Sequence, residues 1–245
     1  MTILLLLLIG FAASFIGTLA GSGGLIGMPS MLLIGVPIHS AIAAAKFSNI
    51  FSSFSSFLFL LKNKNITIKE VSKTAPFGLA GGISGGMMAN AINEDTMTII
   101  AVVLLSFALI MALMKKPSEA ETGNPGINWP VYPALFGIGA YDGMFGPGQA
   151  TLLMHTFIHS GFTYIKAMAF TRFQTFISCF GSFFSFLAAG NFDLQTAVFL
   201  ASGSFLGAQT AVRLAGRISP IYLKRMLHLV TILLIIQLTY RLIVH

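Results

Sequence analysis

Long apolar runs separated by short polar connections follow one another along the chain. Windows of mostly apolar residues lie at Thr2–Ala20, Met97–Met114, Val131–Phe145 and Met226–Val244. A transmembrane helix needs about 20 such residues, so the pattern predicts an all-α polytopic membrane protein. The first run has no basic segment before it and no small-residue cleavage site after it. We therefore expect a retained span and not a signal peptide.

Two glycine-rich breaks interrupt this apolar pattern, "GSGG" at 21–24 and "GPGQ" at 146–149. The eleven residues Leu25–Gly35 that follow the first break reach only about 16 Å as a helix, against a hydrocarbon core of about 30 Å. We therefore expect two half-helices, beginning at Gly24 and Gln149. Non-helical backbone at membrane depth needs surrounding protein or a water-filled cavity, and helix N-termini there form a candidate anion site. The alternative is that these glycines only allow close helix packing.

Charged residues set the expected topology. The connections Lys62–Lys73 and Arg213–Arg225 each contain four Lys or Arg residues, whereas Asn93–Thr96 and Gly190–Asp193 contain none. The positive-inside rule places the first two connections in the cytoplasm. It also explains the net charge of +7 better than a nucleic-acid partner does. Only 9% of residues are charged, against about 25% in soluble domains.

The two halves of the sequence resemble each other. "FSNIFSSFSSFLFL" (Phe47–Leu60) aligns with "FQTFISCFGSFFSF" (Phe173–Phe186) at an offset of 126. The equivalent connections Lys62–Lys73 and Gly190–Asp193 are expected on opposite sides, which is typical of the inverted-topology repeats of secondary transporters. We expect about 8 long helices and 2 half-helices in all. Residues 1–114 form the first repeat, 115–128 a cytoplasmic linker and 129–245 the second repeat.

Ionisable residues inside the apolar segments are the candidate chemistry. Lys46 and Arg172 occupy equivalent positions, and a charge at the bilayer centre costs at least about 2.5–3.5 kcal/mol. A bound anion would neutralise both; the alternative is that they snorkel to an interface or pair with a carboxylate. Asp142, the one carboxylate within a predicted span, is either a proton carrier or an ion partner for Arg172. The predicted substrate-binding residues are Gly21, Ser22, Gly23, Gly24, Lys46, Asn49, Gly146, Gly148, Gln149, Arg172 and Thr175.

At these residues the sequence resembles the TauE/SafE family of membrane permeases, which is associated with sulfite and organosulfonate anions. The resemblance rests on "GSGGLIGMPSMLLIGVPIHSAIAAAK" (21–46) and "YDGMFGPGQATLLMHTFIHSG" (141–161) and covers nearly the whole chain. The chain departs from the family pattern at Arg172, where a lysine is usual, and at Gln149, where a small residue is. The resemblance marks Gly21, Gly23, Gly24, Pro29, Gly35, Pro37, Lys46, Tyr141, Asp142, Gly143, Gly146, Pro147 and Gly148.

These observations predict a secondary transporter that moves a small sulfur-containing anion across the cytoplasmic (inner) membrane by alternating access, with proton coupling through Asp142 as one option. A passive anion channel and a permease for a non-sulfur organic anion are the alternatives. We expect no enzyme, because an HExxH motif is absent and no second carboxylate lies near Asp142. A single cysteine, Cys179, excludes an internal disulfide, and no metal or cofactor is expected. The partners are the anion and the lipid bilayer; the oligomeric state is open.

Overall fold

The computed structural model describes residues 2–20, 23–113, 126–214 and 232, and all regular elements in these ranges are α-helices. The expectation of an all-α protein is therefore confirmed for the described part of the chain. The predicted span at Met226–Val244 lies almost wholly outside the described residues, as does most of the predicted linker. The helices are α1 (Thr2–Ala20), α2 (Gly24–Leu33), α3 (Ile38–Lys62), α4 (Ile68–Ser72), α5 (Ala75–Asn90), α6 (Glu94–Leu113), α7 (Val131–Met144), α8 (Gln149–His159), α9 (Tyr164–Ala188) and α10 (Leu194–Leu214).

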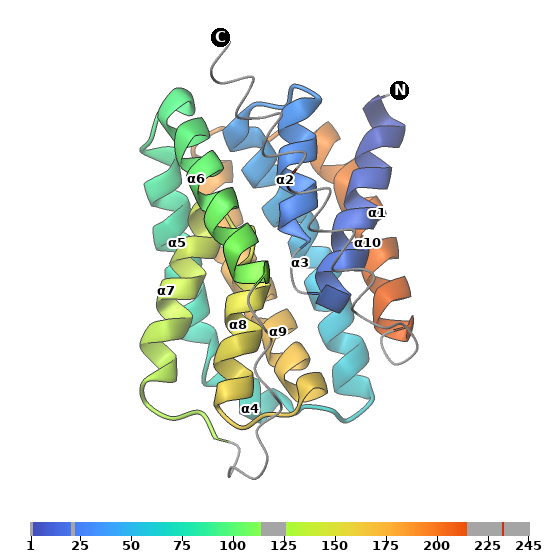
Figure 1. Cartoon of the computed structure of the whole chain (residues 1–245), viewed down its shortest axis with the longest axis vertical. Helices are drawn as coiled ribbons and strands as arrows, with labels where there is room; N and C mark the ends of the chain where they lie inside the picture. Colours follow the sequence, from blue (N-terminus) through green and yellow to red (C-terminus); the bar gives the residue numbers. More distant parts are fainter. Residues whose placement is uncertain (1, 21–22, 114–125, 215–231, 233–245) are drawn as a thin grey trace.

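The two short helices begin where the glycine-rich breaks end. Helix α2 starts at Gly24 and has ten residues, and α8 starts at Gln149 and has eleven. At about 1.5 Å per residue neither crosses a hydrocarbon core of about 30 Å, so the prediction of two half-helices is confirmed. Figure 1 shows them in opposite halves of the bundle, with α2 in the upper half and α8 in the lower half.

One helix of the described residues meets the length and hydropathy of a membrane span. Helix α3, with 25 residues, is long and apolar enough to cross a membrane alone, while Ile3–Leu19 and Gly24–Leu33 are apolar but shorter. Helix α9 has the same length as α3, and both of its ends lie 126 residues after those of α3. Since α3 and α9 contact each other, these two equivalent helices form the centre of the bundle.

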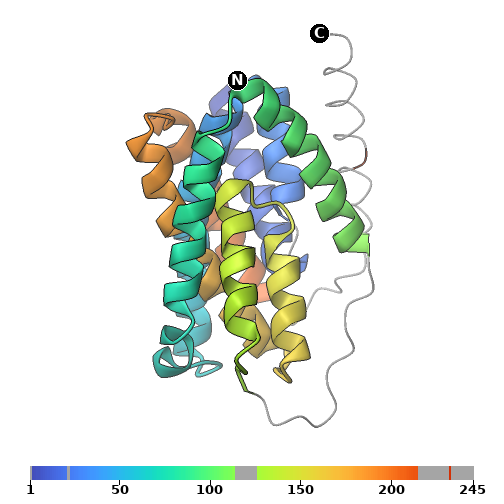
Figure 2. The ribbon, with the colours of Figure 1, turned by 90° about the vertical axis from the view of Figure 1, so that its left-hand side faces the viewer.

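Helices from the two sequence halves interleave. Helix α1 packs on α10, α5 on α7 and on α9, and α3 on α10; each pair joins one helix from 2–113 to one from 126–214. Helix α6 lies tilted at one side of the bundle, as Figure 2 shows. Among the described residues, the long helices of the two halves therefore pack mainly on one another.

Small residues allow the long helices to approach closely. A Cβ added at Gly82 of α5 would overlap the backbone oxygen of Ser178 in α9, and one at Gly203 of α10 would overlap that of Leu7 in α1. Close backbone contact of this kind is how membrane helices associate without a hydrophobic driving force. With the long helices packed in this way, α3 contacts α9 and Gly24 lies against Pro147.

Candidate functional site

A cavity lies where the two glycine-rich breaks meet in the bundle. It measures about 750 Å³, a volume that includes its opening to solvent. Its walls come from α1, α2, α3, α7, α8, α9 and α10. Every described residue of the predicted site lines it, namely Gly23, Gly24, Lys46, Asn49, Asp142, Gly146, Gly148, Gln149, Arg172 and Thr175. Gly21 and Ser22 lie outside the described residues.

The backbone of the breaks explains the need for glycine. Gly146 and Gly148 have φ values of +105° and +86°, which glycine adopts without the steric cost that other residues incur. A Cβ at Gly24 would lie 2.8 Å from the Cα atom of Pro147, so the two breaks touch. The hydroxyl of Tyr141 donates to the carbonyl oxygen of Pro147 at 2.5 Å and fixes the second break. Two helix N-termini therefore open into one cavity.

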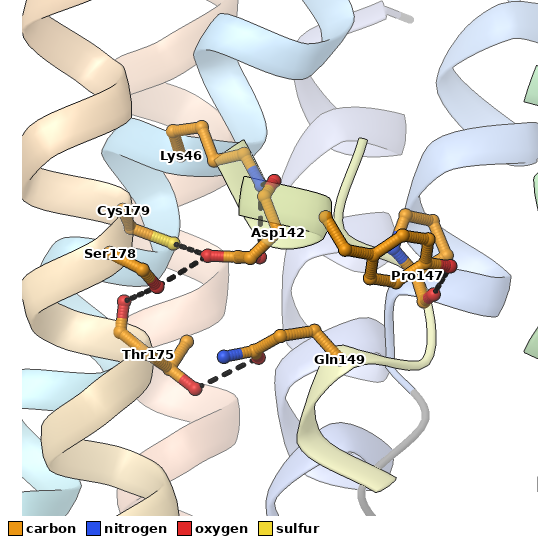
Figure 3. A network of polar contacts seen from close by, with 8 residues as sticks. Lys46, Asp142, Pro147, Gln149, Thr175, Ser178 and Cys179 are labelled. Atoms are coloured by element: carbon orange, nitrogen blue, oxygen red, sulfur yellow. Dashed lines mark hydrogen bonds and ion pairs between the residues drawn. The ribbon is translucent and has the colours of Figure 1, made fainter. Parts of the chain in front are cut away.

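Lys46 and Asp142 form a buried ion pair beside the second break (Figure 3). Lys46 Nζ lies 3.0 Å from Asp142 Oδ1, and the two side chains are only 1% and 2% exposed. Lys46 Nζ also donates to the backbone oxygen of Asp142. The second carboxylate oxygen, Oδ2, accepts from Ser178 Oγ at 2.6 Å and from Cys179 Sγ at 3.4 Å. Both charges are thus paired and hydrogen-bonded, as a buried ion pair requires.

This pairing corrects one prediction from the sequence. Asp142 was expected to partner Arg172 if its role is structural, but its carboxylate contacts Lys46. The reason is that α3 and α9 run antiparallel (Figure 1), which brings each cation to the helix before the break of the other sequence half. Residue spacing does not reveal this contact, because Lys46 and Asp142 are 96 positions apart.

Of the two cations at the cavity, Arg172 has no carboxylate partner among the described residues. Its side chain is 7% exposed, and Nη2 donates to the backbone oxygen of Gly17 at 2.6 Å. Its Nε atom has no hydrogen-bond partner. No carboxylate of the described residues lies within 4.0 Å of it. The cavity therefore carries one positive charge beyond the neutral Lys46–Asp142 pair.

Thr175 and Gln149 complete the polar wall near Arg172. Thr175 Oγ1 donates to Gln149 Oε1 at 3.0 Å (Figure 3), so the Gln149 amide keeps its two N–H donors at the cavity. Sequence reasoning missed Gly17, Ser14 and Ser204, which also line the cavity. For Gly17 a signal existed, because Gly17 precedes Asp142 by 125 residues, the same offset that relates Gly24 to Gln149.

Comparisons with known proteins agree with this architecture. The family model described as sulfite exporter TauE/SafE matches residues 6–238. The probable membrane transporter protein ORF9 of Sinorhizobium sp. is 33% identical over 236 residues, which cover 93% of this chain and 88% of the relative. The probable membrane transporter protein YfcA of Escherichia coli (strain K12) is 26% identical over 212 residues, covering 85% of this chain and 79% of YfcA. A probable membrane transporter protein of Haemophilus influenzae is 26% identical over 214 residues, covering 86% and 84%. No solved structure matches the chain. Since the family model spans nearly its whole length, the chain belongs to the TauE/SafE sulfite exporter family of membrane transporters.

Proposed function

We propose that the protein is a secondary transporter that moves a small sulfur-containing anion across the cytoplasmic membrane by alternating access. The observation that carries the proposal is the cavity at the meeting point of the two breaks. It contains a buried guanidinium, that of Arg172, without a carboxylate partner among the described residues. An uncompensated buried cation is costly, and a bound anion removes that cost.

The helix N-termini add to the attraction for an anion. The first N–H groups of a helix have no intrahelical partner, and the helix dipole places partial positive charge at the same end. Helices α2 and α8 both begin at the cavity wall, at Gly24 and Gln149. Together with Arg172, they offer directed donors to an oxyanion. The one carboxylate among the described cavity residues, that of Asp142, is already paired with Lys46.

An inverted repeat gives this site a route to both sides of the membrane. Helices α3 and α9 have equal lengths at an offset of 126, and α2 and α8 follow equivalent breaks. The helix contacts follow the same equivalence, in which α1, α3 and α5 of the first half match α7, α9 and α10 of the second. The contact of α1 with α10 then matches that of α7 with α5, and the contact of α3 with α10 matches that of α9 with α5. Inverted repeats of this kind support alternating access around a fixed central site.

The sulfur-containing substrate is proposed from the family, whose model is named for sulfite export. The test uses purified protein in proteoliposomes and measures transport of sulfite, thiosulfate, methanesulfonate, sulfate and acetate. We expect transport of at least one sulfur oxyanion, with counterflow stimulated by the same anion on the opposite side. Transport without counterflow indicates a passive channel. Preference for acetate indicates a non-sulfur organic anion, and transport of none of the five overturns the proposal.

A further inference from the structure

Each of the two cavity cations donates to a backbone oxygen in the helix that precedes the break of the other half. Lys46 Nζ donates to the backbone oxygen of Asp142, and Arg172 Nη2 donates to the backbone oxygen of Gly17. Lys46 and Arg172 are 126 residues apart, and Gly17 and Asp142 are 125 apart. Those are the offsets that relate α3 to α9 and Gly24 to Gln149. The two hydrogen bonds are therefore equivalent contacts of the two sequence halves.

The two halves differ in what surrounds this shared contact. At Asp142 a carboxylate accepts from Lys46, from Ser178 and from Cys179. At the equivalent position the chain has Gly17, which has no side chain to accept anything.

The donors that would meet such a carboxylate in the first half are present and largely unused. The residues equivalent to Ser178 and Cys179, 126 positions earlier, are Ser52 and Ser53. The buried Ser53 Oγ has no hydrogen-bond partner, and neither has Arg172 Nε. Ser52 Oγ makes only a long bond of 3.5 Å to a backbone oxygen of its own helix. Buried donors without an acceptor are uncommon in folded proteins, and by the repeat equivalence these are the donors that a carboxylate at position 17 would meet.

We infer that the charged group of the transported anion occupies this place beside Arg172, where it substitutes for the carboxylate that the other half builds in as Asp142. The inference rests on the proposed function and specifies its binding site. The anion lies in the cavity, which Gly17 and Arg172 both line, and accepts from Arg172. The repeat equivalence assigns Ser53 as a second donor. Lys46 does not contact the anion, because Asp142 already occupies its ammonium group.

Charge selects the class of substrate. The Lys46–Asp142 pair is neutral, so Arg172 contributes the one net charge of the site. A monoanionic sulfonate or hydrogen sulfite balances that charge, whereas a dianion such as sulfate leaves an unpaired negative charge away from bulk water. The site therefore favours an oxyanion with one negative charge and several acceptor oxygens.

The experiment measures methanesulfonate and sulfate binding to the purified full chain in nanodiscs by titration calorimetry. Wild-type protein should bind one methanesulfonate per chain, at least tenfold more tightly than sulfate. Arg172→Gln should weaken methanesulfonate binding at least tenfold. Ser53→Ala should weaken it about five- to tenfold, the effect of one lost hydrogen bond. Ser56→Ala is the matched control, because Ser56 Oγ donates to the Ser52 backbone oxygen of its own helix at 2.8 Å. This variant should bind methanesulfonate with wild-type affinity.

A gain of binding tests the equivalence itself. Asp142→Gly reproduces the Gly17 position and frees Lys46, so this variant should bind two methanesulfonate ions per chain. Asp142→Asn keeps the place filled with an amide and should bind one. Wild-type affinity in Ser53→Ala, or a single site in folded Asp142→Gly, overturns the inference while leaving anion transport intact. Wild-type protein that neither binds nor transports any of the five anions overturns the proposed function and the inference together.

Discussion

The Lys46–Asp142 pair gives the sharpest test of how the bundle is held together. Lys46→Met leaves a carboxylate that is 2% exposed without its cation, and Asp142→Asn leaves an ammonium group that is 1% exposed without its anion. Removing one partner of a buried pair costs about 3–5 kcal/mol. In a chain of this size about 1 kcal/mol shifts the unfolding midpoint by about 2–4 °C, so each single variant should unfold roughly 6–20 °C below wild type.

The double variant decides whether the cost comes from the unpaired charge. Lys46→Met together with Asp142→Asn buries no net charge and should unfold closer to wild type than either single variant does. The assay is thermal unfolding in detergent. Unfolding is monitored by the reaction of a thiol probe with Cys179, which is buried in the folded protein. Ser204→Ala is a control that removes two neutral hydrogen bonds, the one accepted from Ser48 at 2.5 Å and the one donated to the Gly10 backbone oxygen at 3.2 Å. It should cost about 1–2 kcal/mol, less than the loss of a charge partner. Single variants within about 2 °C of wild type, or a double variant that loses the sum of both shifts, would refute the reasoning.

Contacts elsewhere in the chain give three more predictions. Lys166 Nζ donates to Glu70 Oε1 at 2.5 Å, and this bond lowers the pKa of Glu70 from its ordinary 4.5. Its stabilisation is present above pH 4.5 and is lost as the pH falls through the folded-state pKa. Since the pair is half-exposed, at most about 1 kcal/mol is involved, and Glu70→Gln should abolish this acid-dependent part of the thermal stability. In a variant without the native cysteine, Asn63→Cys should be labelled from the cytoplasmic side and Gln195→Cys from the other; labelling from one side contradicts the inverted repeat. If Asp142 carries a proton, Asp142→Asn should still bind the anion but lose the response of transport to a pH gradient in proteoliposomes, and an unchanged response excludes that role.

The sequence specified the half-helices because their signals are local. Glycines interrupt the apolar run at both breaks, and at the second break Gly146 and Gly148 have φ values that only glycine adopts readily. The helices begin at the last residue of each break, Gly24 and Gln149, as the sequence predicts. The close packing of α5 on α7 and α9, and of α10 on α1, was predictable for the same reason, since small residues recur at helical spacing in α5 and α10.

Partners across the bundle were not predictable in this way. Which carboxylate meets which cation depends on how α3 and α9 cross, and no local pattern encodes that crossing. The repeat alignment related Lys46 to Arg172 but ignored the contacts each makes, so the Lys46–Asp142 pair was missed. Aligning the contacts, and not only the residues, identifies Gly17 as the position where the two halves differ.

The net charge of the site also constrains the transport cycle. With the cavity empty, Arg172 donates to the Gly17 backbone oxygen and lines a cavity that is open to solvent water. Closing the cavity on both sides removes that water and leaves a buried charge, at a cost of at least about 2.5–3.5 kcal/mol. With a monoanion bound, the charge is balanced and closure avoids this cost. Because about 1.4 kcal/mol corresponds to a tenfold rate, exchange of anion for anion should exceed net efflux about a hundredfold in proteoliposomes. Arg172→Gln should abolish this difference, and equal rates of exchange and net efflux in the wild-type protein would show that Arg172 does not control closure.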